Sequence, residues 1–302
     1  MTASSRMLLG LPAPAKLNLF LRVLRRRPDG YHDLQTAFVA IDLADTLDFE
    51  LLDDGRIERR GDLTGPLEHD LAVRAARLLQ QESRCRLGAR IDLEKRIPTG
   101  GGLGGGSSDA ATSLIALNRL WGLNWTRERL AGLAIRLGAD VPFFLQPGPA
   151  LGEGVGEQLS PLAVPQRWYA VVHPHVHIST AEIFNSTELT AHLERAKIQS
   201  FSEGGPYRAG GGALESWSGC WELCANDLEP IVRSRVPEVD AALRYLGGSG
   251  EARGRPQMSG SGASVFATFE TEVQAQRAIA GVPSGWDSWA VSGLTEHPLA
   301  SW

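Results

Sequence analysis

Residues 98–108 read PTGGGLGGGSS, and this glycine-rich segment leads directly into an apolar stretch that predicts a helix over 107–121. Glycine has no Cβ, so its backbone can adopt positive φ angles and its N–H groups can approach a ligand closely. The N–H groups at the start of a helix, together with the helix dipole, attract anions. The segment therefore predicts a phosphate-binding loop, because a flexible linker would not end in an apolar helix.

Three known glycine-rich motifs differ from this loop. The Walker A spacing is met by Gly101 and Gly106, but Ser107 stands where that motif requires lysine. The dinucleotide fingerprint matches from Gly100 to Gly105, but its acidic partner about 20 residues later would fall in or after a helix, not at the end of a strand. A protein-kinase loop would require HRD and DFG segments, which the sequence lacks. A dinucleotide-binding oxidoreductase stays open as an alternative.

Upstream of the loop, alternating apolar residues predict strands. The alternation over 16–24 predicts a strand with one half-buried apolar face, and it places Lys16, Asn18 and Phe20 together on the opposite face. Turn residues and apolar spacing predict further elements in chain order, namely a turn over 25–30, a strand over 34–51, a helix over 70–83 and a strand over 89–97.

Downstream of the loop, Ser107 or Ser108 is a natural N-cap for the helix over 107–121, and Asp109 suits its positive end. A helix over 126–137 precedes Asp140, which lies in a short loop. The remaining pattern predicts a strand over 164–172, a Gly/Ser-rich loop over 200–219, helices that begin at Pro230 and Pro237, a glycine turn over 258–262, a strand over 265–269 and a helix over 271–280.

This mixture of strands, helices and a hairpin signal predicts an α+β fold and not a doubly wound parallel sheet. The character of the sequence changes near residue 160. We therefore expect two domains, the first over residues 1–158 and the second over residues 159–302.

The composition narrows the class of protein. The chain has 302 residues, a formal net charge of −5 and 43% hydrophobic residues, so it predicts folded domains without a basic surface for nucleic acid. Its apolar runs are shorter than the roughly 20 residues that a membrane span needs. We expect a cytoplasmic protein with no nucleic-acid or membrane partner, and a monomer or a weak homodimer.

Cysteine and histidine spacing does not predict a metal site. Three cysteines give no disulfide framework, and Cys220 and Cys224 lack nearby residues that would complete a set of metal ligands. His173, His175 and His177 alternate and could share one strand face. Because this strand end is bounded by proline, we interpret the histidines as structural.

Three segments in a fixed order resemble the motifs of the GHMP kinases, the superfamily of galactokinase, homoserine kinase, mevalonate kinase and phosphomevalonate kinase. The segment PAKLN at 14–18 resembles the first motif, the loop at 98–108 the second, and MSGSGA at 258–263 the third. The resemblance implies an N-terminal domain like the second domain of ribosomal protein S5 and a ferredoxin-like C-terminal domain. It also implies ATP as phosphate donor, with Mg²⁺ on its phosphates.

Further segments are similar to one branch of the GHMP kinases: DGYHDLQT at 29–36, LGADVPF at 137–143 and EGVGE at 153–157. That branch phosphorylates the C2 hydroxyl of 4-diphosphocytidyl-2-C-methyl-D-erythritol in the non-mevalonate route to isoprenoids. The resemblance therefore implies an ATP-dependent small-molecule kinase whose substrate is a cytidyl diphosphate sugar alcohol. A GHMP kinase of the homoserine or mevalonate type is the alternative.

The resemblance assigns catalytic roles to Lys16 and Asp140. Asp140 matches the family's catalytic aspartate, whose carboxylate can accept the proton of the substrate hydroxyl. Lys16 matches the neighbouring lysine, which can stabilise the forming alkoxide. Without the motif, Asp140 would be interpreted as a helix cap and Lys16 as an exposed strand residue.

Binding roles follow from the same resemblance. The nucleotide-binding set is Lys95, Pro98, Thr99, Gly100, Gly101, Gly102, Leu103, Gly104, Gly105, Gly106, Ser107 and Ser108. The substrate-binding set is Asn18, Tyr31, His32, Thr180 and Phe184. Tyr31 would stack on the cytosine and His32 would hydrogen-bond its edge, although Tyr31 could instead pack on its own hairpin and Phe184 could belong to the core. Asp70 replaces a family asparagine and, when ionised, cannot donate a hydrogen bond to adenine.

Overall fold

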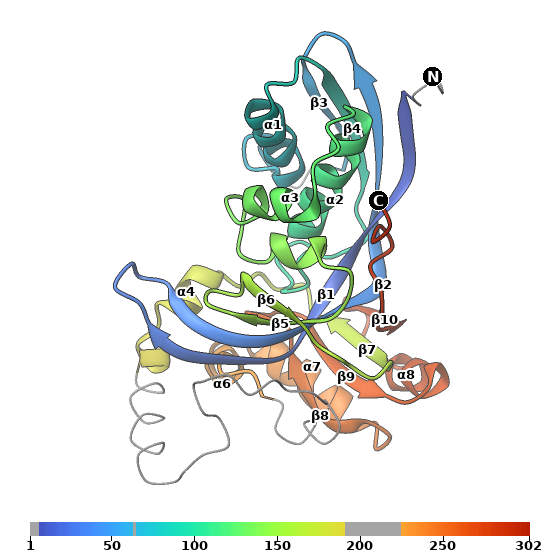
Figure 1. Ribbon diagram of the computed structural model, residues 1–302. Coiled ribbons are helices and arrows are strands. Elements are labelled where there is room, and N and C mark those ends of the chain that lie inside the picture. The colour runs from blue at the N-terminus through green and yellow to red at the C-terminus, as the bar shows by residue number, and fades with distance from the viewer. Residues whose placement is uncertain (1–5, 63–64, 191–224) are drawn as a thin grey trace.

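The computed structural model describes residues 6–62, 65–190 and 225–302, which form two sheets with helices packed on them (Figure 1). The described elements are β1 (Met7–Arg26), β2 (His32–Leu52), β3 (Ile57–Gly61), α1 (Leu71–Ser83), β4 (Gly88–Glu94), α2 (Gly105–Leu120), α3 (Arg127–Ala134), the 3₁₀ helix η1 (Val141–Leu145), β5 (Ala150–Glu153), β6 (Gln158–Pro161), β7 (Trp168–His173), α4 (Thr180–Phe184), α6 (Glu229–Arg235), α7 (Pro237–Gly247), β8 (Arg253–Met258), β9 (Val265–Phe269), α8 (Glu272–Ile279) and β10 (Asp287–Ser292). The predicted loop over 200–219, Cys220 and Cys224 lie outside the described residues.

The first sheet has the strand order β3-β4-β2-β5-β6, and β1 pairs with β2 beside this path. β3 runs parallel to β4, whereas the other neighbours are antiparallel. Helices α1, α2 and α3 pack beside its β3–β4 end (Figure 1). Their shared core includes Phe49 and Ile91 from the strands and Leu114 from α2, so burial of this apolar face fixes where α2 begins relative to the sheet.

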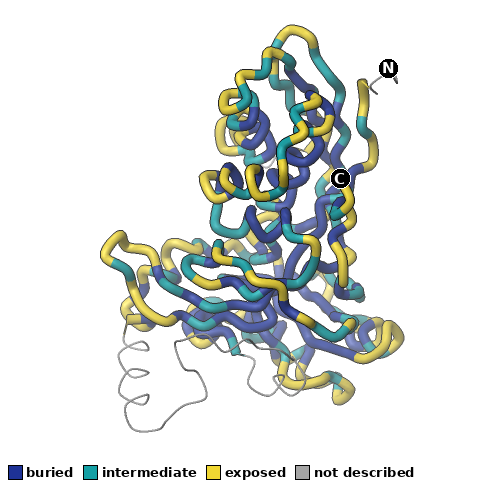
Figure 2. Tube along the Cα trace, viewed as in Figure 1, coloured by how far each residue is buried: buried dark blue, intermediate teal, exposed yellow. Residues whose placement is uncertain are grey.

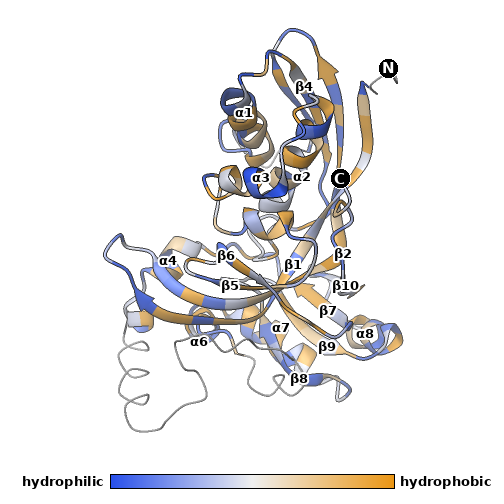
Figure 3. Cartoon of the chain, viewed as in Figure 1, coloured by the Kyte–Doolittle hydropathy of each residue, from blue (hydrophilic) through white to orange (hydrophobic). Residues whose placement is uncertain are grey.

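The second sheet has the order β10-β7-β9-β8, with every neighbour antiparallel. The chain passes from β7 through helices to β8 and β9, and then through α8 to β10. This βαββαβ connection is that of a ferredoxin-like domain, and it confirms the predicted α+β class. The central strands β7 and β9 are mostly hydrophobic (Figure 3), because α7 and α8 cover one face of the sheet and β1–β2 covers the other.

The long β1–β2 hairpin joins the two halves of the molecule and is buried over much of its length (Figure 2). Leu17 packs with Tyr169 of the second sheet, while Lys16 and Asn18 on the opposite face are only 2% and 3% exposed. The prediction of a half-buried strand is therefore wrong, because both faces are covered. A register shift after Asn18 moves Phe20 out of their row and into the apolar core.

Two helices begin at prolines, as the sequence predicts. α6 and α7 carry Pro230 and Pro237 in their first turns, where the missing N–H of proline removes no helical hydrogen bond. The first sheet ends with β6 and the second begins with β7, and the domain division that we propose after residue 158 falls at the start of β6. Within the described ranges, no helix has the length and hydrophobicity to cross a membrane.

His297 should make the fold sensitive to acid. Its imidazole is buried, and burial together with the charge of Arg127 lowers its pKa to about 4. Its Nδ1 accepts the N–H of Leu299. Because the unfolded chain takes up this proton near pH 6.5 and the folded chain does not, stability falls as pH drops from about 6.5 to 4, by about 3 kcal/mol. Urea titrations at stepped pH should show this slope, and His297→Asn, which keeps an acceptor, should reduce it; an unchanged slope would contradict the assignment.

Candidate active site

The glycine-rich loop, predicted to bind phosphate, ends where α2 begins. Gly104 is the N-cap with a φ of 73°, and no side chain caps the helix. The N–H of Ser108 donates to the carbonyl of Gly104 at 2.9 Å, so the N–H groups of residues 105–107 precede the helical ladder and lack carbonyl partners within it. They are available to an anion.

The predicted cap at Ser107 or Ser108 is wrong, and Asp109 does not lie in the first turn. Glycine tolerates the left-handed conformation of Gly104, so the N-cap lies three residues before Ser107. A side-chain cap would occupy the backbone N–H groups that an anion needs. Because no side chain caps α2, these N–H groups remain available to a ligand, as the predicted role of the loop requires.

The third motif and β1 both meet the glycine-rich loop. Gly102 has a φ of 74°, and a Cβ on it would lie 2.2 Å from the carbonyl oxygen of Ser259. The Ser259 hydroxyl donates to the carbonyl of Gly102 at 3.0 Å. The N–H of Lys16 donates to the carbonyl of Leu103 at 2.9 Å. Segments far apart in the sequence thus pack together. Position 102 requires glycine because the backbone of Ser259 lies too close for a side chain.

Lys16 and Asp140 lie side by side and both line one large cavity. Lys16 Nζ is 3.3 Å from Asp140 Oδ2, and it donates to Asn18 Oδ1 at 2.5 Å. The Asn18 amide in turn donates to Thr36 Oγ1 at 2.8 Å. The Lys16 side chain is 3% exposed and that of Asp140 35%, so the ammonium is held rigidly while the carboxylate faces open space.

Asp140 occupies the N-cap position of η1, but its side chain makes no capping hydrogen bond. A carboxylate that does not cap its helix remains able to accept a proton or a hydrogen bond from a ligand. The Lys16 ammonium also lies 5.6 Å from the centre of the Phe38 ring. The pair is therefore built into the wall of the cavity.

This cavity, the acceptor cleft, has a volume of about 1030 Å³. One end is formed by Lys16 and Asp140, and it also contains Tyr31, His32 and Phe184. The rings of His32 and Phe184 have centres 5.4 Å apart and are tilted by 40°. Burial, with the charge of Arg26 as a smaller cause, lowers the pKa of His32, so its neutral imidazole can both donate and accept.

The remaining predicted substrate residues also line the acceptor cleft. Tyr31 is 65% exposed, so it does not pack into its own hairpin and its ring is accessible. Thr180 begins α4 and its hydroxyl lies 2.7 Å from Ser261 Oγ. Asn18 contributes to the cleft, although both ends of its amide are already occupied by neighbours. The position of Asn18 would allow it both to orient the Lys16 ammonium and to contact a ligand.

A second cavity, the loop cavity, lies on the other side of the glycine loop and has a volume of about 310 Å³. The two cavities share the loop as a wall, through Gly100, Gly102, Gly104 and Ser107. Lys95, Pro98 and Thr99 line the loop cavity only, together with Gly101, Gly105 and Gly106. The arrangement separates a large cleft from a smaller one at the glycine-rich loop.

Two of the residues considered for the nucleotide line neither cavity, and a third makes other contacts. Leu103 and Ser108 are buried and line neither of these cavities. Asp70 borders the loop cavity, but its carboxylate caps α1 by accepting N–H groups of Ala72 and Val73, and it also accepts from Arg59 Nε at 3.0 Å. An aspartate at position 70 is therefore explained by its role as the N-cap of α1.

Sequence reasoning did not assign some residues that the fold brings to the cleft. Gly260 and Ser261 of the third motif line it, as does His177. Asn226 donates to the carbonyls of Met258 and Gly260, at 2.8 and 2.7 Å. The third motif was a signal for the glycine turn, whereas a lone asparagine beyond a long Gly/Ser-rich stretch carries no local signal.

The three spaced histidines do not share a strand face. β7 ends at His173, and His175 has a positive φ of 56°. His173 lies 3.2 Å from Ser264 Oγ beneath the loop, whereas His175 pairs with Asp287 at 2.9 Å. These contacts assign two of the histidines to separate structural roles.

Family models match both halves of the chain: residues 70–148 match the GHMP kinases N terminal domain, and residues 211–288 match the GHMP kinases C terminal model. A protein of Aromatoleum aromaticum named 4-diphosphocytidyl-2-C-methyl-D-erythritol kinase is 49% identical over all of this chain and 99% of its own length. A protein of the same name from Thiobacillus denitrificans is 52% identical over 95% of this chain and 96% of its length.

Solved structures agree with these relatives. A crystal structure of 4-(cytidine 5'-diphospho)-2C-methyl-D-erythritol kinase has 36% identity and a TM-score of 0.74, and the match covers 94% of this chain and 99% of that one. A homoserine kinase from Cytophaga hutchinsonii, at 18% identity and a TM-score of 0.70 over 98% of this chain and 97% of its own, shares the fold. The chain belongs to the 4-diphosphocytidyl-2-C-methyl-D-erythritol kinase family of GHMP kinases and is a small-molecule kinase.

Proposed function

We propose that this enzyme transfers the γ-phosphoryl group of ATP to the C2 hydroxyl of 4-diphosphocytidyl-2-C-methyl-D-erythritol, with Lys16 and Asp140 at the reacting atoms. The observation that carries the proposal is the Lys16–Asp140 pair, 3.3 Å apart, in a cleft that also contains Tyr31, His32 and Phe184. The names of the relatives support the choice of substrate. An oxidoreductase finds no such support, because its chemistry does not need this pair.

On the acceptor side, Asp140 takes the proton of the hydroxyl as the oxygen attacks phosphorus. Its open carboxylate supports this role, since a general base must reach the proton directly. Lys16 stabilises the negative charge that develops on the oxygens. A buried, hydrogen-bonded ammonium is already oriented, so little reorganisation is needed in the transition state.

On the donor side, the N–H groups at the start of α2 hold the phosphates of ATP. Phosphoryl transfer depends mainly on positioning and charge stabilisation, which these backbone groups supply without a side-chain cap. The adenosine part then lies in the loop cavity beside Lys95, Pro98 and Thr99. Mg²⁺ enters with ATP as part of the substrate, because phosphate oxygens provide most of its ligands.

The cytidyl group is recognised at the aromatic end of the cleft. Tyr31 offers an exposed ring face for stacking on cytosine, and the neutral His32 beside Phe184 can hydrogen-bond the edge of the base. The volume of about 1030 Å³ exceeds the needs of homoserine or mevalonate. The cleft size therefore supports a substrate of nucleotide size.

A coupled assay of ADP release should identify the acceptor. We expect turnover with ATP and 4-diphosphocytidyl-2-C-methyl-D-erythritol, and none with homoserine, mevalonate or galactose. Mass spectrometry should show one added phosphoryl group, and carbon–phosphorus coupling in the NMR spectrum should locate it on C2. Turnover of homoserine or mevalonate without turnover of the cytidyl substrate would refute the proposal.

A further inference from the structure

A buried aspartate contacts the chain just before the phosphate-binding loop and lies outside the motif segments quoted above. Asp45 is 0% exposed, in the middle of β2. Its Oδ1 accepts the N–H groups of Arg96 and Ile97, at 2.6 and 2.9 Å, and its Oδ2 accepts from the Lys95 ammonium. A buried carboxylate is costly unless it is paired in this way, so its partners indicate what it holds.

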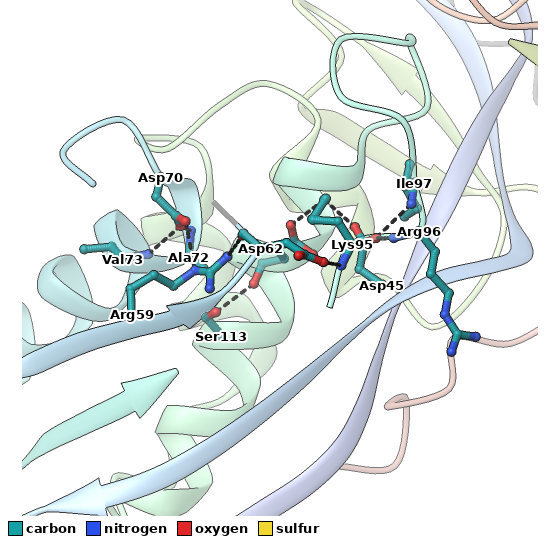
Figure 4. A network of polar contacts seen from close by, with 11 residues as sticks. Asp45, Arg59, Asp62, Asp70, Ala72, Val73, Lys95, Arg96, Ile97 and Ser113 are labelled. Carbon is teal, nitrogen blue, oxygen red and sulfur yellow. Dashed lines mark hydrogen bonds and ion pairs between the residues drawn. The ribbon is translucent and has the colours of Figure 1, made fainter. Parts of the chain in front are cut away.

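Those partners connect the two ends of the loop. Residues 95–97 immediately precede the loop, and the Lys95 ammonium also donates to Asp109 Oδ2 of α2 at 2.8 Å. Figure 4 shows Asp45 and Lys95 within one continuous set of polar contacts. Asp45 therefore restrains the chain entering the loop, and through Lys95 it restrains the helix leaving it. A loop fixed at both ends loses less conformational entropy when a ligand binds.

The same group of charges borders the loop cavity, where Lys95 and Asp109 contribute to the lining. Asp109 is 3% exposed, and its Oδ1 has no hydrogen-bond partner within the part of the chain that the structure describes. Asp45 and Lys95 are the charged groups that face it; the neighbouring Asp70 is occupied by Arg59. Two carboxylates thus share one ammonium beside a cavity that would receive a polyanion.

We propose that Asp45 is a positioning residue for the nucleotide, which holds both ends of the phosphate-binding loop through residues 96–97 and through the Lys95–Asp109 pair. This inference rests on the proposed ATP site. It predicts that a loss of the Asp45 charge weakens ATP binding and leaves the acceptor cleft intact, because the Lys16–Asp140 pair makes no contact with Asp45 among the described hydrogen bonds and ion pairs.

The test is Asp45→Asn in the full chain, with a non-hydrolysable ATP analogue as the probe in isothermal titration calorimetry. Asparagine keeps an oxygen for the two backbone N–H groups but presents an amide to the Lys95 ammonium. We expect the Kd of the analogue to rise about tenfold or more. The KM for the cytidyl substrate should stay within about twofold, since uniform loss of structure would change both.

A pH profile separates positioning from a purely structural role. Burial and then the charge of Asp45 raise the pKa of Asp109 to about 7, against the effect of Lys95. A protonated Asp109 repels the nucleotide less, so affinity should fall as pH rises through about 7. In Asp45→Asn the pKa of Asp109 falls and this change should move to lower pH. Titration of the nucleotide phosphate is common to both proteins and cancels in their ratio.

Asp227→Asn is a matched control, because Asp227 is a buried carboxylate that accepts the N–H of Val23 at 2.9 Å and pairs with Arg22. It borders neither cavity, so this variant should melt lower but bind the analogue as the wild type does.

Equal weakening in both variants, or a wild-type Kd and pH profile in Asp45→Asn, would overturn the inference. If Asp45→Asn does not fold, Asp109→Asn should remove the change near pH 7, and an unchanged profile there would equally overturn it.

The outcome also distinguishes this inference from the proposed function. A wild-type chain that binds the analogue but does not turn over the cytidyl substrate would refute the acceptor assignment alone. A wild-type chain that does not bind the analogue would refute the ATP site and, with it, the inference. A chain with full activity in which Asp45→Asn binds the analogue normally would refute only the role of Asp45.

Discussion

Asp140→Asn should lower kcat by about 10²–10⁴-fold, the effect of losing a general base. The substitution keeps the shape of the side chain but removes its capacity to accept the hydroxyl proton, and it removes the negative partner that lies 3.3 Å from Lys16 Nζ. Because Asp140 makes no capping hydrogen bond at η1, the helix loses nothing that would unfold the site. The coupled ADP assay measures kcat, and calorimetry measures the Kd for the ATP analogue, which should change little.

A surface substitution controls for general effects of removing an acidic group. Asp53 is 70% exposed and pairs with Arg6, and such exposed pairs contribute little to stability. Asp53→Asn should therefore retain wild-type kcat and a wild-type melting temperature. If Asp140→Asn kept kcat within about threefold of the wild type, the reacting hydroxyl would need another base, and the proposed chemistry at this pair would be wrong.

Local patterns predicted the elements well where one face is apolar or a breaker residue ends the run. The alternation in β1, the helix over α1 and the two proline-started helices all appear in the structure. The same patterns could not show that the polar face of β1 is covered as well, because its cover is the glycine-rich loop and the third motif, which lie far along the chain. Burial of Lys16 and Asn18 is a tertiary property, and their polarity predicted the opposite.

The site was predictable through motifs and not through periodicity. Lys16 and Asp140 are far apart in the sequence, and only the fold brings their charged groups within contact distance. Asp45 and Asn226 had no signal at all, because each is a single polar residue whose partners lie in other segments of the chain. The misplaced cap at Ser107 or Ser108 has a different cause, since intrinsic capping preference was overruled by the left-handed Gly104.

Lys16→Met should lower kcat by about 10²–10³-fold, the usual effect of losing one preorganised group that stabilises transition-state charge. Methionine preserves most of the apolar stem of Lys16. This stem packs closely against Gly104, where an added Cβ would lie 3.0 Å from Lys16 Cγ. The Kd for the ATP analogue should stay within about threefold if the ammonium acts mainly in the transition state. A raised KM with unchanged kcat would instead make Lys16 a ground-state ligand.

Combining the two substitutions tests whether the pair acts as one unit. Lys16 and Asp140 contact each other directly. Removing either group should therefore already abolish most of the transition-state stabilisation that depends on the other. We therefore expect the double variant Lys16→Met/Asp140→Asn to be slower than the more damaged single variant by less than about tenfold. Additive losses would mean that the two groups act on separate steps. That result would contradict a mechanism in which proton removal and charge stabilisation occur at the same oxygen.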